Sequence, residues 1–196
     1  MISHSTTHAS LLARLSGGAD RGAWAEFFDR YAELIRGFAQ RQNVQPVECD
    51  DILQDVLMAL TKSMPDFVYD PAKGKFRSYL KTAVLHAIYR RSCQKGGAVS
   101  LENLEALTEA GAIDETIEAG WEAEWRQYHL RQAMKAIAAE FNESDRQAFE
   151  RYALAGGDAR ETAEGLKMSV DQVYQAKSRI LRRLSELIDQ QVQDEG

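Results

Sequence analysis

The stretch Asp50–Arg91 decides the fold: it reads DDILQDVLMALTKSM over 50–64, PDFVYDPAKGK over 65–75 and FRSYLKTAVLHAIYRR over 76–91. The first and last pieces carry apolar residues at intervals of three and four, which is typical of amphipathic helices. Proline and glycine punctuate the middle piece, which predicts a loop. From Lys73 to Lys95 there are seven basic residues and no acidic one. An acidic helix, an aromatic loop and a basic helix therefore follow one another. Such a unit could hold a protein partner on one side and a phosphate backbone on the other.

The residues before this stretch extend the helical pattern to the N-terminus. Residues 8–16 predict a short first helix, and 19–42 predict a longer second one. The second carries aromatic and aliphatic residues on one face, which favours a hydrophobic core: Trp24, Phe27, Phe28, Tyr31, Ile35 and Phe38. Pro46 suits the first turn of a third helix. Residues 1–93 are therefore predicted to form one all-helical domain.

Residues 94–120 lose this regularity and predict an acidic linker, with a short helix expected near 101–107. The segment 101–127 holds eight acids against one base and carries a charge of −7, while the whole chain carries −6. The remainder is therefore +1, and its bases are clustered. Because local patches decide whether phosphate can approach, the acidic total does not exclude a nucleic-acid partner.

Residues 121–196 predict a second helical domain, opened by Trp121 and Trp125. Three capping signatures follow the first amphipathic helix: Ser144-x-x-Gln147, Asp158-x-x-Glu161 and Ser169-x-x-Gln172. A short helix, a tight turn and a longer capped helix are typical of a helix-turn-helix. Together with the N-terminal domain, this predicts an all-α fold of two small helical domains joined by the acidic linker.

The last predicted helix carries the side chains expected of a helix lying in the major groove. Amides and hydroxyls can read base edges, and guanidinium and ammonium groups bind guanine or phosphate. We expect these residues to contact duplex DNA: Ser169, Gln172, Tyr174, Gln175, Lys177, Ser178, Arg179, Arg182 and Arg183.

Both regions resemble parts of bacterial RNA polymerase sigma factors of the extracytoplasmic-function (ECF) type, within the sigma-70 family. The first resemblance rests on Asp50-Asp51-Ile52, Gln54, Val56, Phe67, Phe76-Arg77, Tyr79-Leu80, Thr82-Ala83 and Arg90-Arg91. The second rests on Ala163, Leu166, Met168-Ser169-Val170, Val173-Tyr174, Ala176-Lys177, Arg179 and Leu184. The two occur in the family's order and together cover most of the chain.

The resemblance implies a factor that binds RNA polymerase core and directs promoter recognition, DNA melting and transcription initiation. It assigns core binding and the −10 element to residues 1–93 and the −35 duplex to residues 121–196. The resemblance implies that Asp50, Asp51, Gln54 and Asp55 dock on the polymerase core. It implies that the −10 strand is bound by Phe67, Tyr69, Lys75, Arg77, Tyr79, Lys81, His86, Arg90 and Arg91. His86 stands where the family commonly has asparagine. Lys167 stands where its turns usually have glycine, so either the lysine tolerates a strained backbone or the turn differs.

Other classes of function have less support in the sequence. The four histidines form no evident catalytic triad and no phosphate-binding loop motif is present, so we expect neither an enzyme nor a bound cofactor or metal. Cys49 and Cys93 form no paired motif, and no secretory signal or membrane-spanning run is seen, so we expect a cytoplasmic protein. Expected partners are RNA polymerase core, promoter DNA and an anti-sigma factor or other regulator. Two alternatives are a free-standing helix-turn-helix regulator and an adaptor that binds polymerase without directing it to promoters.

Overall fold

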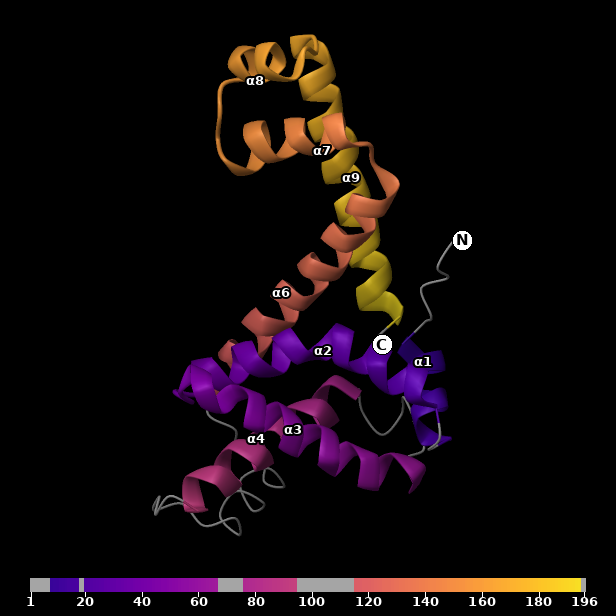
Figure 1. Ribbon diagram of the computed structural model, residues 1–196, viewed down its shortest axis with the longest axis vertical. Coiled ribbons are helices and arrows are strands. Elements are labelled where there is room, and N and C mark those ends of the chain that lie inside the picture. Colours follow the sequence, from indigo (N-terminus) through magenta and orange to yellow (C-terminus); the bar gives the residue numbers. More distant parts are fainter. Residues whose placement is uncertain (1–7, 18–19, 67–75, 95–114, 195–196) are drawn as a thin grey trace. The chain divides into compact units, whose positions relative to one another are not determined.

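The computed structural model describes residues 8–17, 20–66, 76–94 and 115–194, and every regular element within these ranges is a helix (Figure 1). This confirms the predicted all-α class. The chain folds into two compact units, and the boundary between them falls after Tyr128. Among the described residues, no helix is both long enough and apolar enough to cross a membrane.

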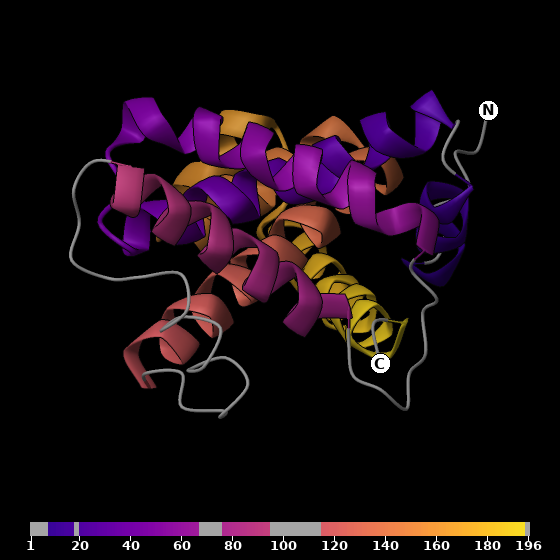
Figure 2. The ribbon, with the colours of Figure 1, turned by 90° about the horizontal axis from the view of Figure 1, so that it is seen from below.

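Four of the helices of the first unit match the sequence prediction closely. They are α1 (His8–Ser16), α2 (Arg21–Arg41), α3 (Pro46–Ser63) and α4 (Phe76–Gln94), with a short 3-10 turn η1 (Met64–Asp66) after α3. Asp20 caps α2 by accepting from the backbone N–H of Ala23, and proline occupies the first turn of α3. Seen from below, α2, α3 and α4 lie next to one another (Figure 2).

The core of the first unit is aromatic at its centre. Phe27, Tyr31 and Phe76 lie within 6.2 Å of one another, measured between ring centroids. Their rings are fully buried together with Ile35 and Phe38 of the same α2 face. The predicted aromatic stripe of the second helix is thus confirmed as core, with Phe28 alone largely exposed.

The first half of α6 (Glu115–Glu140) also belongs to this core. Trp121 and Trp125 are at most 3% exposed, and the Trp121 ring packs edge-on against Phe38 at 4.9 Å. Tyr128 stacks on Tyr31 at 5.2 Å. The structure therefore places both tryptophans in the first unit, whereas the sequence assigned them to the second domain. The helix that carries them begins at Glu115, inside the predicted linker.

The second unit contains the rest of α6 and the predicted helix-turn-helix. Its helices are α7 (Glu143–Phe149), which continues as the π-helical turn η3 (Glu150–Leu154), then α8 (Ala159–Leu166) and α9 (Val170–Asp194). Ala163 packs with Val173 and Ala176 in a small buried cluster. A second cluster joins Ile137 and Phe149 to Ile180 and Leu184.

Two of the three predicted helix caps are confirmed. Asp158 accepts from the N–H groups of Arg160 and Glu161. Ser169 and Gln172 form a reciprocal capping box, since each side chain accepts from the other residue's backbone N–H. The Ser144 cap is wrong: α7 begins earlier, and Asn142 caps it by accepting from the N–H of Asp145.

Candidate nucleic-acid interface

The acidic residues predicted to dock on polymerase lie on α3 and are tied to neighbouring bases. Arg36 Nε donates to Asp50 Oδ1 at 2.7 Å. Arg91 of α4 donates to Asp51 and lies 4.0 Å from Asp55. The remaining residue of the set, Gln54, is exposed. The structure thus brings the four residues together on one helix, with basic partners on both sides.

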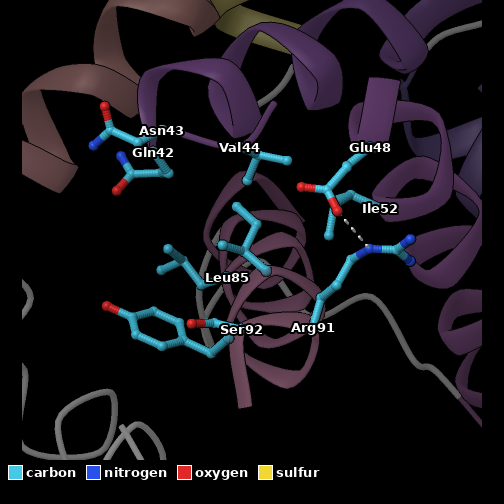
Figure 3. Close-up of a pocket in the computed structure, with 10 residues that line it drawn as sticks. Gln42, Asn43, Val44, Glu48, Ile52, Leu85, Arg91 and Ser92 are labelled. Carbon is cyan, nitrogen blue, oxygen red and sulfur yellow. Dashed lines mark ion pairs between the residues drawn. The ribbon is translucent and has the colours of Figure 1, made fainter. Parts of the chain in front are cut away.

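A pocket of about 290 Å³ lies beside this face, where the end of α2, the start of α3 and the end of α4 meet (Figure 3). Ile52 and Leu85 form part of its apolar wall. Glu48 and Arg91 face each other across its rim, with 3.8 Å between carboxylate and guanidinium. Arg91 therefore contacts acids of α3 while belonging to the basic helix α4, so it links the two predicted surfaces.

Two bases of α4 that were predicted to contact the −10 strand are covered by α6. Lys81 Nζ donates to Glu118 Oε2 at 2.5 Å, and Lys81 is only 9% exposed. Arg77 forms an ion pair with Glu122, and its guanidinium lies 5.3 Å from the Trp125 ring centroid. In this conformation neither base is available to a phosphate backbone.

The other predicted −10 residues differ in their surroundings. Arg90 is exposed near the end of α4. Tyr79 is partly buried, and its hydroxyl lies 2.5 Å from the hydroxyl of Ser63. His86 is partly buried, and its Nε2 atom makes no hydrogen bond within the described residues. Phe67, Tyr69 and Lys75 lie outside the described residues.

The outward face of α9 is the best-formed candidate surface for duplex DNA. Val173, Ala176, Ile180 and Leu184 point into the second unit and are buried. At 100° per residue, the opposite side of the helix is centred on Gln175, Ser178 and Arg182, and all three are exposed. The Arg182 side chain is 76% exposed. Amide, hydroxyl and guanidinium groups therefore share one solvent-facing strip.

Of the other residues predicted for this surface, Ser169, Gln172 and Tyr174 are exposed at the start of α9. Ser169 and Gln172 are also engaged in the capping box. Lys177 is partly buried, with its Nζ 5.0 Å from the centroid of the Tyr152 ring. Tyr174 packs edge-on against the same ring.

Arg179 and Arg183 lie to one side of this strip and are held by carboxylates. Arg179 donates to both oxygens of Asp145 at 3.0 Å, and Asp145 is buried. Arg183 donates to both oxygens of Glu140 at 2.7 and 2.8 Å. This pairing lowers the pKa of Glu140 and raises that of Arg183. Both arginines therefore fix α9 against the rest of the second unit.

Sequence reasoning missed the acidic partners of these bases. Glu118, Glu122 and Glu124 were counted only as part of the acidic segment 101–127, and Asp145 and Glu140 were not singled out. Their spacing gives one usable signal: Glu118, Trp121, Glu122 and Trp125 fall on one helical face. Such a face predicts a helix that buries its aromatics against a basic neighbour.

Comparison with known proteins supports the first of the two resemblances, the one in residues 50–91. Residues 27–96 match the family model for sigma-70 region 2, a segment that contains most of α2 and all of α3 and α4. This part of the chain is therefore similar to region 2 of the sigma-70 family, which supports the first of the two resemblances. A solved structure, CnrH in complex with the cytosolic domain of CnrY, matches with 20% identity and a TM-score of 0.36. The match covers 91% of this chain and 95% of that one. No curated protein matches the chain.

Proposed function

We propose that the protein is a sigma factor of the ECF type that binds RNA polymerase core and directs it to promoters in the cytoplasm. The observation that carries this proposal is the region 2 match over 27–96. Region 2 supplies the acidic face of α3 for the polymerase and the basic helix α4 for DNA. The proposed factor performs no chemistry of its own, since nucleotide addition belongs to the polymerase.

In this proposal the second unit reads the upstream promoter element as duplex DNA. A helix in the major groove presents one strip of side chains to base edges while its opposite side stays packed on its own domain. Gln175, Ser178 and Arg182 form such a strip on α9. Arg179 and Arg183 act in this arrangement mainly by positioning the helix, because carboxylates already hold them.

The first unit would hold the −10 strand through α4 and the loop before it. Among the bases of α4, Arg90 is the one whose side chain is exposed in the structure, so it could contact DNA without a rearrangement. Base stacking on Phe67 and Tyr69 of the loop would complete the contact with unpaired bases. His86 would then contact the strand at a position where the family commonly has asparagine. Its imidazole can stack on a base or form a hydrogen bond with it.

The test is co-purification of the full chain with bacterial core RNA polymerase, followed by transcription from a library of randomised promoters. A sigma factor yields a stable complex and transcripts whose templates share two separated sequence blocks. Complex formation without transcripts supports the adaptor. Duplex binding without a polymerase complex supports the free-standing regulator, and either result contradicts the proposal.

A further inference from the structure

We propose that residues 115–128 of α6 form an acidic strap that covers the DNA-binding face of α4 in the free protein. This inference rests on the proposed function and adds a mode of regulation to it. The strap belongs to the first unit, where it packs on α2 and α4. While it is in place, Arg77 and Lys81 pair with strap carboxylates instead of promoter phosphates.

The electrostatic contacts of the strap imitate those of a phosphate backbone. Glu118 and Glu122 lie one helical turn apart and pair with Lys81 and Arg77, which are also one turn apart. A strand of DNA that reached this face would present phosphates to the same two bases. Carboxylates and phosphates therefore compete for one surface, and occupation by one excludes the other.

Aromatic packing anchors the strap to the core. Trp121, Trp125 and Tyr128 occupy the buried side of the strap, and their rings contact Phe38 and Tyr31 of α2. Release of the strap from α2 would expose these aromatic rings to water, and this cost opposes release. We therefore expect weak binding of single-stranded DNA by the free chain, in spite of the seven bases between residues 73 and 95.

Glycine lets the strap approach α2 closely. Gly37 lies in the interior of α2, where glycine is unfavourable relative to alanine. A Cβ at this position would overlap the carboxylate of Glu124, which is 7% exposed and accepts from Arg41 Nε at 2.6 Å. Gly37→Ala should therefore favour α2 itself while loosening the strap, without changing any charge.

The first experiment measures binding of the full-length protein to fluorescein-labelled single-stranded DNA of random sequence. Glu118→Gln and Glu122→Gln each remove one strap contact, and Glu115→Gln removes the same charge from an exposed position of the same helix. We expect the first two variants to bind about twofold to fivefold more tightly than the Glu115→Gln control. Equal affinities for all three variants would overturn the inference.

The second experiment follows the strap directly through tryptophan emission. Two of the three tryptophans in the chain lie in the strap, so Trp24→Phe leaves only these two as reporters. In that background, Gly37→Ala should shift the emission to longer wavelength and raise DNA affinity together. An unchanged emission and affinity, or a shifted emission without tighter binding, would contradict a strap that covers a DNA-binding face.

Two further measurements separate this inference from the proposed function. Arg90→Ala removes an exposed base of α4 outside the strap contacts, so loss of DNA affinity in this variant reports that α4 binds DNA. Suppose that the parent chain binds core polymerase, that Arg90→Ala lowers DNA affinity and that the strap variants do not raise it. This result overturns only the strap. Failure of the parent chain to bind core polymerase overturns the proposed function instead.

Discussion

Lys167 holds the turn between α8 and α9 in a left-handed backbone conformation, with φ of 54° and ψ of 42°. This settles the choice that the sequence left open, since the turn keeps the usual geometry and the lysine adopts it. In this region a residue with a Cβ suffers a steric strain from which glycine is free.

Lys167→Gly should therefore stabilise the second unit. We expect a gain of about 0.5–1 kcal/mol in the free energy of unfolding, because relief of the backbone strain exceeds the added flexibility of the unfolded chain. Urea denaturation of the full chain measures it. Lys167→Ala removes the same charge without relieving the strain, so a gain of equal size in that variant would show that the charge is responsible.

Asp158 makes the stability of the second unit depend on pH. Hydrogen bonds from the backbone N–H groups of Glu161 and Arg160 lower the pKa of its carboxyl below the ordinary value of 3.8. A lowered folded-state pKa means that the stabilisation is complete above the ordinary value and is lost as the pH falls through the folded-state value.

Asp158→Asn is the matched variant, because asparagine keeps the capping oxygen but does not titrate. We expect the Tm of the parent chain relative to Asp158→Asn to decrease as the pH is lowered from about 6 to about 3. Other carboxylates titrate equally in both proteins, so the difference isolates this group. A Tm difference that stays constant across the range would show that the cap does not act through its charge.

At the scale of the element, α9 carries Arg182, an exposed arginine for which we propose contact with DNA, and two arginines, Arg179 and Arg183, that carboxylates hold in place. Arg182→Ala should weaken duplex binding and lower the slope of log affinity against log salt by about one, since one phosphate or base contact is lost. Unfolding should be unaffected, because the side chain is 76% exposed. Fluorescence anisotropy over a salt series measures the first effect, and urea denaturation measures the second.

Arg179→Ala should have the opposite profile, because it leaves the buried carboxylate of Asp145 without the guanidinium nitrogen that donates to both of its oxygens. We expect the free energy of unfolding to fall by about 1–2 kcal/mol. Arg179→Lys serves as the control, since it keeps one positively charged nitrogen donor near Asp145. If Arg179→Ala lowered duplex affinity at unchanged stability, Arg179 would be a reading residue.

The elements that could be predicted from the sequence are those whose partners are also near in the sequence. The caps at Asp158 and Ser169 depend on local spacing, and so does the buried stripe of α9. Spacing predicts Val170, Val173, Ile180, Leu181 and Leu184 for this stripe, but Leu181 is 46% exposed. Trp121 shows the limit of this reasoning. Helical periodicity places it on an apolar face, but periodicity does not state which core receives that face, and its partner Phe38 lies far away in the chain.

In the candidate site, too, the features that depend on neighbouring residues could be predicted, and those that depend on distant residues could not. Exposure of Gln175, Ser178 and Arg182 follows from the periodicity of α9 alone. The covering of Lys81 by Glu118 spans 37 residues, and it could not be deduced from a segment that was expected to be an acidic linker. Asp145 was missed because an acid in the first turn of a helix gives no signal of an ion pair until its arginine partner is placed beside it.

At the scale of the whole molecule, the proposed function requires two separate surfaces, one for polymerase on α3 and one for duplex DNA on α9. Gln54 tests the first surface with the least disturbance, because it is exposed on α3. Asp51 is less suitable, since its loss would also release Arg91.

Gln54→Ala should lower affinity for core polymerase by about fivefold to thirtyfold, the range of a residue that contributes strongly to an interface. Gln45→Ala is the matched control: it removes the same amide from the N-cap position of the same helix, where the side chain makes no capping hydrogen bond. Affinity of both variants for duplex DNA should equal that of the parent chain, because α9 belongs to the other unit. Equal core affinities for Gln54→Ala and Gln45→Ala would place the docking face elsewhere. A loss of duplex affinity in Gln54→Ala would instead show that the two surfaces do not act independently.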